Sequence, residues 1–554
     1  MVYAACSNGK ATRNIAKQLS SFLLILIVIL FTISLASCGL GEQSLPKMQF
    51  EFTLTQQEVA DALDVAAQLD SYIDNGKSAK IISTTKQLLK ELDYLLHQYR
   101  VGEIKYYSDL ENGDAYTMYV FSEEAYMAVR EECLRVLKKL YHSDLLAKTI
   151  IFADWSDKEI NMLEASSPEI IALEKEQNEL MREYLTLDAS DLDAWSNALE
   201  EINYQFVDSA QQLADFYGYD NYYDYAAKEI YTRDYSKEQR EAFRKHVKEN
   251  ILPFYIEMQT LYREKRAALT AEQKALLSSL RNDSCTPSNE YLTGYIASYP
   301  KTMETVMNRL FSRNALVYSQ SENAYVAAFT DFSHYYNQPY VFLGNDCQNL
   351  LTLVHELGHY SAFYHFTDAT LPYDTCEVHS QGNEWMIMNY LDGIIESEVY
   401  EVFLLWRLSL GLENIVLCTF IDEYEETVYT QAELSSPQAF ETILTQVLAG
   451  YQGIEQMASA EDIYIYAQQV TMESPVYYLS YATSELAAMS FYTVAEEDGY
   501  ETAQEIYINL CLKTPTDNTF FDTLADVGLP DPFALDTVTK LKNTFNAVFA
   551  DKAA

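Results

Sequence analysis

The sequence predicts a mainly α-helical protein with two lobes around a deep cleft and a small β-hairpin at the edge of that cleft. Only 17 glycines and 12 prolines occur in 554 residues, so long helices can run without interruption. Apolar residues make up 49% of the chain, which is enough for a large core. A chain of this length favours two lobes over one.

The first 37 residues have the pattern of a targeting segment, and we leave them out of the predicted fold. A basic start is followed by the apolar run Phe22–Ile33, which is short for a membrane-spanning helix. It leads to Leu35-Ala36-Ser37-Cys38, which resembles the lipobox of bacterial lipoproteins. That resemblance implies cleavage before Cys38, lipid attachment to this cysteine, and a protein anchored to the bacterial cell membrane outside the cytoplasm. The alternative is an uncleaved anchor helix, which would also place the rest of the chain outside the cytoplasm.

A linker over residues 38–50 precedes an N-terminal helical domain, which we place at residues 51–202. Its first helix is expected to begin after Thr55, because Thr55 and Glu58 have the spacing of a capping box. Gly76 is the predicted stop signal of this helix.

Residues 203–554 form the predicted second domain. Ser236 and Gln239 make another capping box, and Pro253 is expected to kink the helix that follows. The stretches 324–332 and 339–343 are short and rich in β-forming residues, so we expect a hairpin there.

The next helix, for which Asp346 is the expected N-cap, carries the motif His355-Glu356-Leu357-Gly358-His359. Two histidines four apart project from one face of a helix. Both imidazoles can bind one tetrahedral zinc at about 2.0–2.1 Å, which leaves room for a third protein ligand and a water molecule. Glu356 then lies beside that water and is a candidate general base. The motif predicts a helical zincin with one zinc ion per chain.

The third ligand is expected from a second helix that packs against the first, after a loop at Leu371-Pro372-Tyr373-Asp374. Glu377 and Glu384 are seven residues apart, so both face the same side of such a helix. His365 is another candidate, because metzincin-type enzymes carry a third histidine six residues after the second. Those enzymes need a glycine where this chain has Ala362. The carboxylates that follow the motif are Asp368, Asp374, Glu377 and Glu384.

His355–His359 and the run Cys376–Glu384 resemble the active site of the thimet oligopeptidase and oligoendopeptidase F family. The resemblance implies that Glu377 is the third zinc ligand and that Glu384 supports a ligand histidine. The run Tyr477–Ser484 resembles the family's C-terminal tyrosine segment, which implies that Tyr478 and Tyr481 stabilise the tetrahedral intermediate. The similarity covers roughly the last two-thirds of the chain.

Two positions depart from the family pattern. The family usually has a further histidine where this chain has Ala362, and another upstream of the tyrosines, whereas no histidine follows His379 here. Metal binding and the general base do not depend on these positions. Substrate preference, rate and stabilisation of the transition state do.

Charge and cysteine content restrict the partners. The formal net charge is −44, and about −47 without the three basic residues of the targeting segment. Such a field repels nucleic acid, which we exclude as a partner, and it can attract basic peptides. The cysteines after Cys38 form no CxxC pair, so we expect no cysteine-rich zinc site and at most one or two disulfides.

The sequence therefore predicts a zinc metalloendopeptidase that cuts short, unstructured peptides outside the cytoplasm. The strand 339–343 is expected at the cleft, where it can pair with an extended substrate backbone. Two other functions remain open. One is a peptidyl dipeptidase resembling angiotensin-converting enzyme, which would release dipeptides from the C-terminus. The other is a non-catalytic peptide-binding lipoprotein, which has no need of the Glu356 carboxylate.

Overall fold

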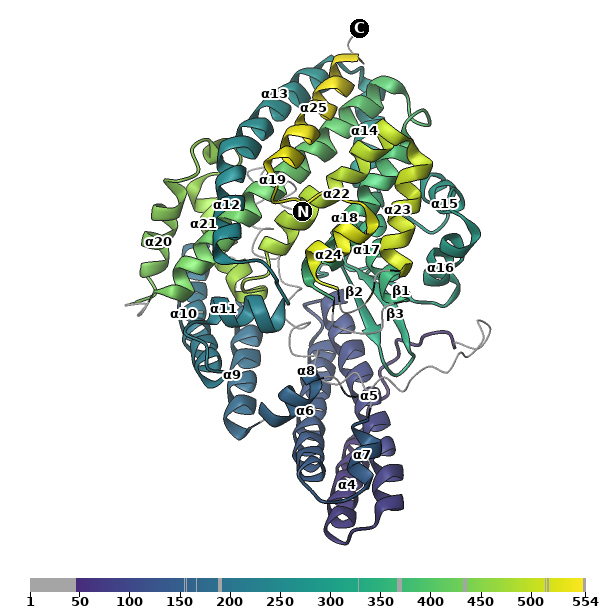
Figure 1. The fold of residues 1–554 in the computed structure, drawn as a ribbon, viewed down its shortest axis with the longest axis vertical. Helices are drawn as coiled ribbons and strands as arrows, with labels where there is room; N and C mark the ends of the chain where they lie inside the picture. Colours follow the sequence, from purple (N-terminus) through teal and green to yellow (C-terminus); the bar gives the residue numbers. More distant parts are fainter. Residues whose placement is uncertain are drawn as a thin grey trace.

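The computed structural model describes residues 46–551, apart from residues 154, 156, 166, 188–191, 327, 366–370, 432–435, 514 and 516–517. The targeting segment 1–37, with Cys38 after it, and Asp368 lie outside the described residues. Figure 1 shows a large helical body with further helices projecting below it. The mainly helical fold with a small sheet is as predicted.

The N-terminal helices form the lower part of the molecule in Figure 1. Thr55 makes the predicted capping box with Glu58, and the helix that follows ends just before Gly76, whose φ is +64°. A continuous helix, α10, crosses the expected domain boundary between residues 202 and 203. The elements are α4 (Gln56–Asp74), α5 (Ser78–Ser108), α6 (Gly113–Tyr141), α7 (Ala147–Ile151), α8 (Asp157–Ala165), α9 (Pro168–Leu185) and α10 (Leu192–Phe216).

The next group of helices begins the upper body. Ser236 makes the predicted capping box with Gln239. The expected kink at Pro253 takes the form of a π-helical turn just before the proline, which has no backbone N–H to donate. The elements are α11 (Tyr222–Tyr225), the π turn η1 (Ala226–Ile230), α12 (Lys237–His246), the π turn η2 (Val247–Ile251), α13 (Leu252–Ala268), α14 (Ala271–Asn282), α15 (Glu290–Ala297) and α16 (Lys301–Ser312).

The sheet contains the predicted hairpin and one strand that the sequence did not indicate. Strands β2 (Ala328–Ser333) and β3 (Gln338–Leu343) are antiparallel, with Ala328 opposite Leu343. Strand β1 (Leu316–Tyr318) pairs parallel to β3, so the strand order is β1-β3-β2. The expectation that the strand 339–343 pairs with an extended substrate backbone is therefore wrong, because β3 is the central strand and pairs with both β1 and β2. Among the described residues, β2 is the strand with an unpaired edge beside the site.

The helices after the sheet complete the body around α19. This helix is long and apolar enough to cross a membrane by length and composition, but 83% of its most apolar window is buried inside the protein. It is therefore a core helix, packed mainly against α13 and α22. The elements are η3 (Asn345–Cys347), α17 (Leu350–Phe363), α18 (Tyr373–Leu391), α19 (Ser397–Thr430), α20 (Ala439–Leu448), η4 (Ile454–Gln456), α21 (Ala460–Glu473), α22 (Leu479–Asp498), α23 (Tyr500–Lys513), α24 (Phe520–Val527) and α25 (Leu535–Asp551).

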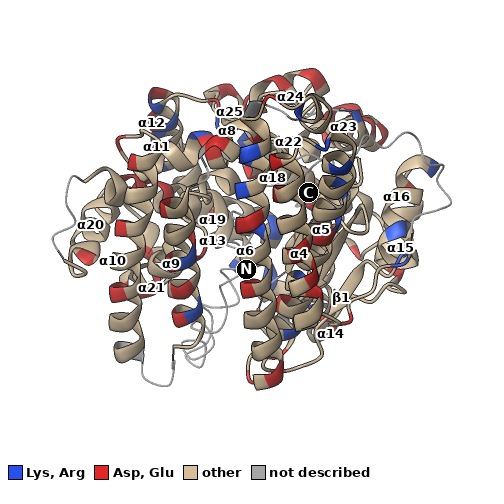
Figure 2. Ribbon diagram, turned by 90° about the horizontal axis from the view of Figure 1, so that it is seen from below, with Lys and Arg blue, Asp and Glu red and all other residues tan. Residues whose placement is uncertain are grey.

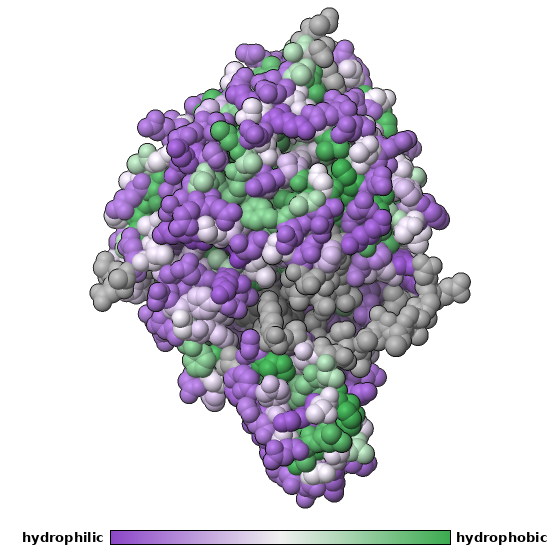
Figure 3. Space-filling view, viewed as in Figure 1, coloured by the Kyte–Doolittle hydropathy of each residue, from purple (hydrophilic) through white to green (hydrophobic). Residues whose placement is uncertain are grey.

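The chain has 82 acidic and 38 basic residues, and Figure 2 shows where Asp and Glu (red) and Lys and Arg (blue) lie along the helices seen from below. Apolar surface gathers on the projecting N-terminal helices in Figure 3. Leu146 and Ile150, 73% and 54% exposed, lie at the short helix α7 of that group. The six cysteines of the described part are free, so the disulfides left open by the sequence are not formed there.

A glycine permits a close approach between α17 and α18. A Cβ atom added at Gly358 would lie 2.4 Å from the carbonyl oxygen of His379 and 2.7 Å from the Cα atom of Ser380. Both are backbone atoms, so a side chain there could be accommodated only by moving the two helices apart. The close approach brings the motif of α17 beside the carboxylates of α18.

We expect Gly358→Ala to lower the free energy of unfolding by about 1–3 kcal/mol, because it overpacks a helix–helix contact. Urea denaturation followed by circular dichroism measures the change. Gly113→Ala is the matched control, since a Cβ atom at this position, in the first turn of α6, meets nothing within 4 Å. It should leave stability unchanged or raise it by up to about 1 kcal/mol. Equal stabilities of the two variants would contradict the close-packing argument.

Candidate metal centre

Two consecutive helices supply the metal-binding candidates. Helix α17 is apolar and buried along most of its length, and its N-cap is Asn349, whose side chain accepts a hydrogen bond from the Thr352 amide at 3.0 Å. The expected cap Asp346 instead lies in the 3₁₀ turn η3. Helix α18 begins at Tyr373, just after Pro372, so Tyr373 and Asp374 of the predicted loop already belong to the helix. The two helices pack directly against each other.

His355, His359 and Glu377 meet between these helices. One ligand atom from each lies within 4.8 Å of the others. The Glu377 Oε2 atom is 3.7 Å from His355 Nε2 and 3.6 Å from His359 Nε2. Two ligands at about 2.0–2.1 Å from one tetrahedral zinc lie roughly 3.3–3.4 Å apart. The separations and the donor types therefore fit a zinc ion.

The two histidines have opposite electrostatic surroundings. Burial holds the pKa of His359 well below its ordinary value, so its imidazole is neutral at pH 7. Burial also acts to lower the pKa of His355, but the hydrogen bond and charge of Glu384 outweigh it and raise this pKa to about 9. His355 Nδ1 donates to Glu384 Oε1 at 2.8 Å, which leaves Nε2 directed at the cluster.

Glu384, predicted to support a ligand histidine, is itself held by residues that sequence reasoning missed. Arg407 of α19 pairs with two acids: its Nε atom is 3.0 Å from Glu384 Oε2, and its Nη2 atom is 2.9 Å from Glu485 Oε1. Trp385 Nε1 donates to the same Glu485 oxygen at 2.9 Å. Arg407 is only 2% exposed. An arginine inside the apolar run Val402–Leu412 was the available signal, because such a charge is buried only when it is paired.

Glu356 lies on the same helix as the two histidines but takes no part in the three-residue cluster. Its Oε2 atom accepts a hydrogen bond from Thr330 Oγ1 of β2 at 2.7 Å. Burial raises the pKa of Glu356 to about 7, against the opposing effects of His355 and Thr330. A carboxylate of this kind can accept a proton near neutral pH.

Three tyrosines near the start of α22 have different surroundings. Tyr477, not selected from the sequence, donates from its hydroxyl to Glu377 Oε1. Tyr481 stacks edge-on against Tyr477, with ring centroids 5.0 Å apart, and the charges of Glu377 and Glu356 act on it. Tyr478 turns toward Tyr466, to which its hydroxyl is hydrogen-bonded. Adjacent tyrosines in sequence gave no signal of which one meets the carboxylate.

Two further histidines lie outside the donor cluster. His365 has no atom among the grouped donors, and its ring contacts Tyr364. His379 is fully buried, and it is hydrogen-bonded to the backbone of Leu510. Neither contributes to the three-residue cluster.

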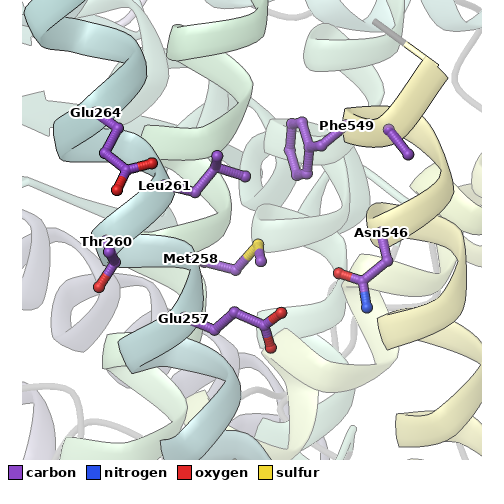
Figure 4. A pocket seen from close by; sticks show the side chains of 8 residues that line it. Glu257, Met258, Thr260, Leu261, Glu264, Asn546 and Phe549 are labelled. Atoms are coloured by element: carbon purple, nitrogen blue, oxygen red, sulfur yellow. The ribbon is translucent and has the colours of Figure 1, made fainter. Parts of the chain in front are cut away.

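A groove of about 370 Å³ lies between α13 and α25, away from the residues of the cluster (Figure 4). It mixes apolar side chains with two acids, Glu257 and Glu264, and Glu257 is paired with Lys542 at 3.4 Å. It contains no histidine or cysteine, so it offers no comparable donor set.

A sequence comparison relates part of this chain to a peptidase. A segment of 123 residues is 32% identical to Oligopeptidase PepF of Bacillus subtilis (strain 168) and covers 20% of this chain. The match spans 18% of the length of that relative. No family model matches the chain.

Solved structures resemble the chain over most of its length. A protein assigned as oligoendopeptidase F from Bacillus anthracis str. Ames has a TM-score of 0.68 at 16% identity, covering 92% of this chain and all of its own. PZ peptidase A with an inhibitor has a TM-score of 0.67 at 16% identity, over 90% and 99% of the two chains. Oligoendopeptidase-F from Enterococcus faecium has a TM-score of 0.55 at 12% identity, over 90% and 97%. The chain therefore has the oligoendopeptidase F fold.

We expect the purified chain to bind one equivalent of zinc, measured by elemental analysis after dialysis. Glu377→Ala should lose this zinc, because one of three donors is gone. Glu384→Gln should keep it with affinity weakened about 10–100-fold, since the support of His355 and the pairing with Arg407 are weakened but no ligand is lost. His365→Ala is the control and should bind as the wild type does. Full zinc binding by Glu377→Ala would show that Glu377 is not the third ligand, and Glu384 or His365 would then be the next candidate.

Proposed function

We propose that this chain is a zinc-dependent oligopeptidase that hydrolyses short, unstructured peptides outside the cytoplasm. One observation carries the proposal: two histidines and a glutamate form a zinc-compatible cluster, and a buried glutamate lies on the same helix between the histidines. The oligoendopeptidase F fold and the sequence match to Oligopeptidase PepF support it.

His355, His359 and Glu377 would hold the zinc, which as a Lewis acid would polarise the scissile carbonyl and lower the pKa of a water molecule. Glu356 is the proposed general base. The Thr330 hydroxyl orients the Glu356 carboxylate. The pKa of Glu356, about 7, suits a group that takes a proton from water and passes it to the leaving amine. Glu384 and Arg407 keep His355 in one orientation.

Tyr481 is the proposed donor to the developing oxyanion. It is one of the two tyrosines expected from the sequence, and the charges of both Glu356 and Glu377 act on it. Its side chain is partly exposed, so it can reach a substrate. A hydroxyl aimed at the developing negative charge stabilises the transition state more than the bound substrate. The Tyr478 hydroxyl is hydrogen-bonded to Tyr466, and Tyr478 has no such role in this proposal.

The substrate backbone is proposed to pair with β2. This strand carries Thr330, the residue that contacts Glu356, and it lies at one edge of the described sheet, with β1 at the other edge. Main-chain hydrogen bonds to an edge strand need an extended peptide but no particular sequence. Selectivity should then depend mainly on length and extension, with a preference for basic peptides from the net charge of −44.

The location is proposed from the sequence alone. The lipobox-like run that ends at Cys38 supports a lipid anchor on the outer side of the bacterial cell membrane.

The activity is tested with peptides of increasing length and with a folded protein that contains the same sequences. We expect internal cleavage of the short peptides, measured by mass spectrometry of the products, and an intact folded protein. Glu356→Gln is the matched control: its amide cannot accept the proton, so turnover should fall by at least about 100-fold while zinc stays bound.

Three outcomes would contradict this function. Equal turnover by Glu356→Gln would exclude that residue as the base. Release of dipeptides from the C-terminus alone would instead indicate a peptidyl dipeptidase. Binding of peptides by zinc-loaded wild type without any cleavage would indicate a binding protein.

The anchor has its own test. In a bacterium with lipoprotein processing, the chain should fractionate with membranes and incorporate an acyl-chain probe, and Cys38→Ser should abolish the labelling. Label that persists in Cys38→Ser would refute attachment at this cysteine.

A further inference from the structure

The two oxygens of Glu377 have different partners. Oε2 faces both histidines at 3.6 and 3.7 Å and accepts a hydrogen bond from Ser380 Oγ at 2.9 Å. Oε1 accepts a hydrogen bond from the hydroxyl of Tyr477. Both Glu377 and Tyr477 are buried. The carboxylate is therefore held with one oxygen toward the cluster and the other toward a tyrosine.

The turn that carries Tyr477 has an unfavourable backbone conformation. Val476 has a φ of +66°, which is unusual for a β-branched residue. The turn joins α21, which ends at Glu473, to α22, which begins at Leu479. Such strain persists only where surrounding contacts impose it, and it concentrates at functional sites. Here it directs Tyr477 to Glu377 and the next residue, Tyr478, to Tyr466.

Buried hydrogen bonds impose this conformation. Arg233 Nη2 donates to the carbonyl oxygens of Val476 at 2.7 Å and of Tyr477 at 3.1 Å. The Tyr231 hydroxyl donates to the carbonyl oxygen of Pro475 at 2.7 Å. The amide of Val476 donates to Glu425 Oε1 at 2.9 Å. Two segments of the body, the stretch between η1 and α12 and the helix α19, thus hold the turn.

Asp374 fixes the turn relative to α18, the helix that carries Glu377. Asp374 is fully buried one helical turn before Glu377. Its Oδ2 atom accepts a hydrogen bond from Ser480 Oγ at 3.3 Å and lies 3.9 Å from Arg233 Nε, while Oδ1 accepts one from Thr483. The first turn of α22 is therefore pinned to the first turn of α18, which brings the Tyr477 hydroxyl to Glu377.

We propose that Tyr477 is a positioning residue that makes Glu377 a ligand through one oxygen only. The Tyr477 hydroxyl is hydrogen-bonded to Glu377 Oε1, so only Glu377 Oε2 would face a bound metal. A carboxylate that bound through both oxygens would take the coordination position that a catalytic zinc keeps for water or substrate. Tyr477 acts through Glu377 and does not touch the substrate, in contrast to the role proposed for Tyr481. This inference rests on the zinc site of the proposed function.

The test compares Tyr477→Phe with Tyr478→Phe. Each change removes one buried tyrosine hydroxyl, from adjacent positions, but only the first removes a partner of Glu377. We expect Tyr477→Phe to bind zinc about 10–100-fold more weakly in a chelator competition, as loss of a partner behind a ligand usually does. Tyr478→Phe should stay within about twofold of the wild type.

Cobalt(II) in place of zinc gives a readout that does not depend on activity. Its visible absorption weakens as the coordination number rises. Tyr477→Phe should absorb more weakly than cobalt-loaded wild type and Tyr478→Phe, because Glu377 can then bind through both oxygens. Wild-type zinc affinity and an unchanged cobalt spectrum in Tyr477→Phe would overturn the inference, as would an equal loss in Tyr478→Phe.

Arg233→Lys supplies a second variant if Tyr477→Phe does not fold. Lysine keeps the charge beside Asp374 but cannot donate to two carbonyls with the fixed geometry of a guanidinium. Weaker zinc binding with a weaker cobalt absorption supports the inference, and unchanged values contradict it. A wild-type chain that binds no zinc would instead refute the proposed function, so the two failures are distinguishable.

Discussion

The backbone of α17 approaches that of α18 at Gly358 so closely that no Cβ atom fits between them. The candidate metal centre depends on this contact. The histidines project from α17 and Glu377 from α18, and a donor cluster with separations of 3.6 and 3.7 Å requires the two helices to pack without an intervening side chain. The rest of the body holds this helix pair: β2 and β3 contact α17, and α22 packs along α18.

The centre buries several acids, and each of them has a compensating partner. Glu384 and Glu485 share Arg407, Glu356 has the Thr330 hydroxyl, and Glu377 has the hydroxyls of Ser380 and Tyr477. A buried carboxylate without such partners would bind a proton instead. The same partners fix side-chain orientation, so the contacts that make burial tolerable also preorganise the site. A dication at the cluster would offset further negative charge.

The N-terminal helices are connected to the site through α21. The Tyr184 hydroxyl of α9 donates to the buried Glu473, the last residue of α21. Asn203 of α10 donates to the Gln468 carbonyl oxygen at 2.8 Å. Glu473 directly precedes the strained turn that carries Tyr477. Buried hydrogen bonds therefore tie α9 and α10 to the helix that leads into this turn, and satisfied buried networks make such a region rigid.

The sequence by itself determined what depends on local spacing. Capping boxes at Thr55 and Ser236 gave two helix starts, and the intervals within His355–His359 and between Glu377 and Glu384 placed these side chains on common helix faces, because the period of a helix is fixed. Only the tertiary structure decided contacts between distant segments. It paired Arg407 with Glu384, made β3 the central strand, and chose Tyr477 over Tyr478 to meet Glu377. Adjacent tyrosines are equivalent in a sequence, and they differ here because Arg233 and Glu425, far away along the chain, set the turn between α21 and α22.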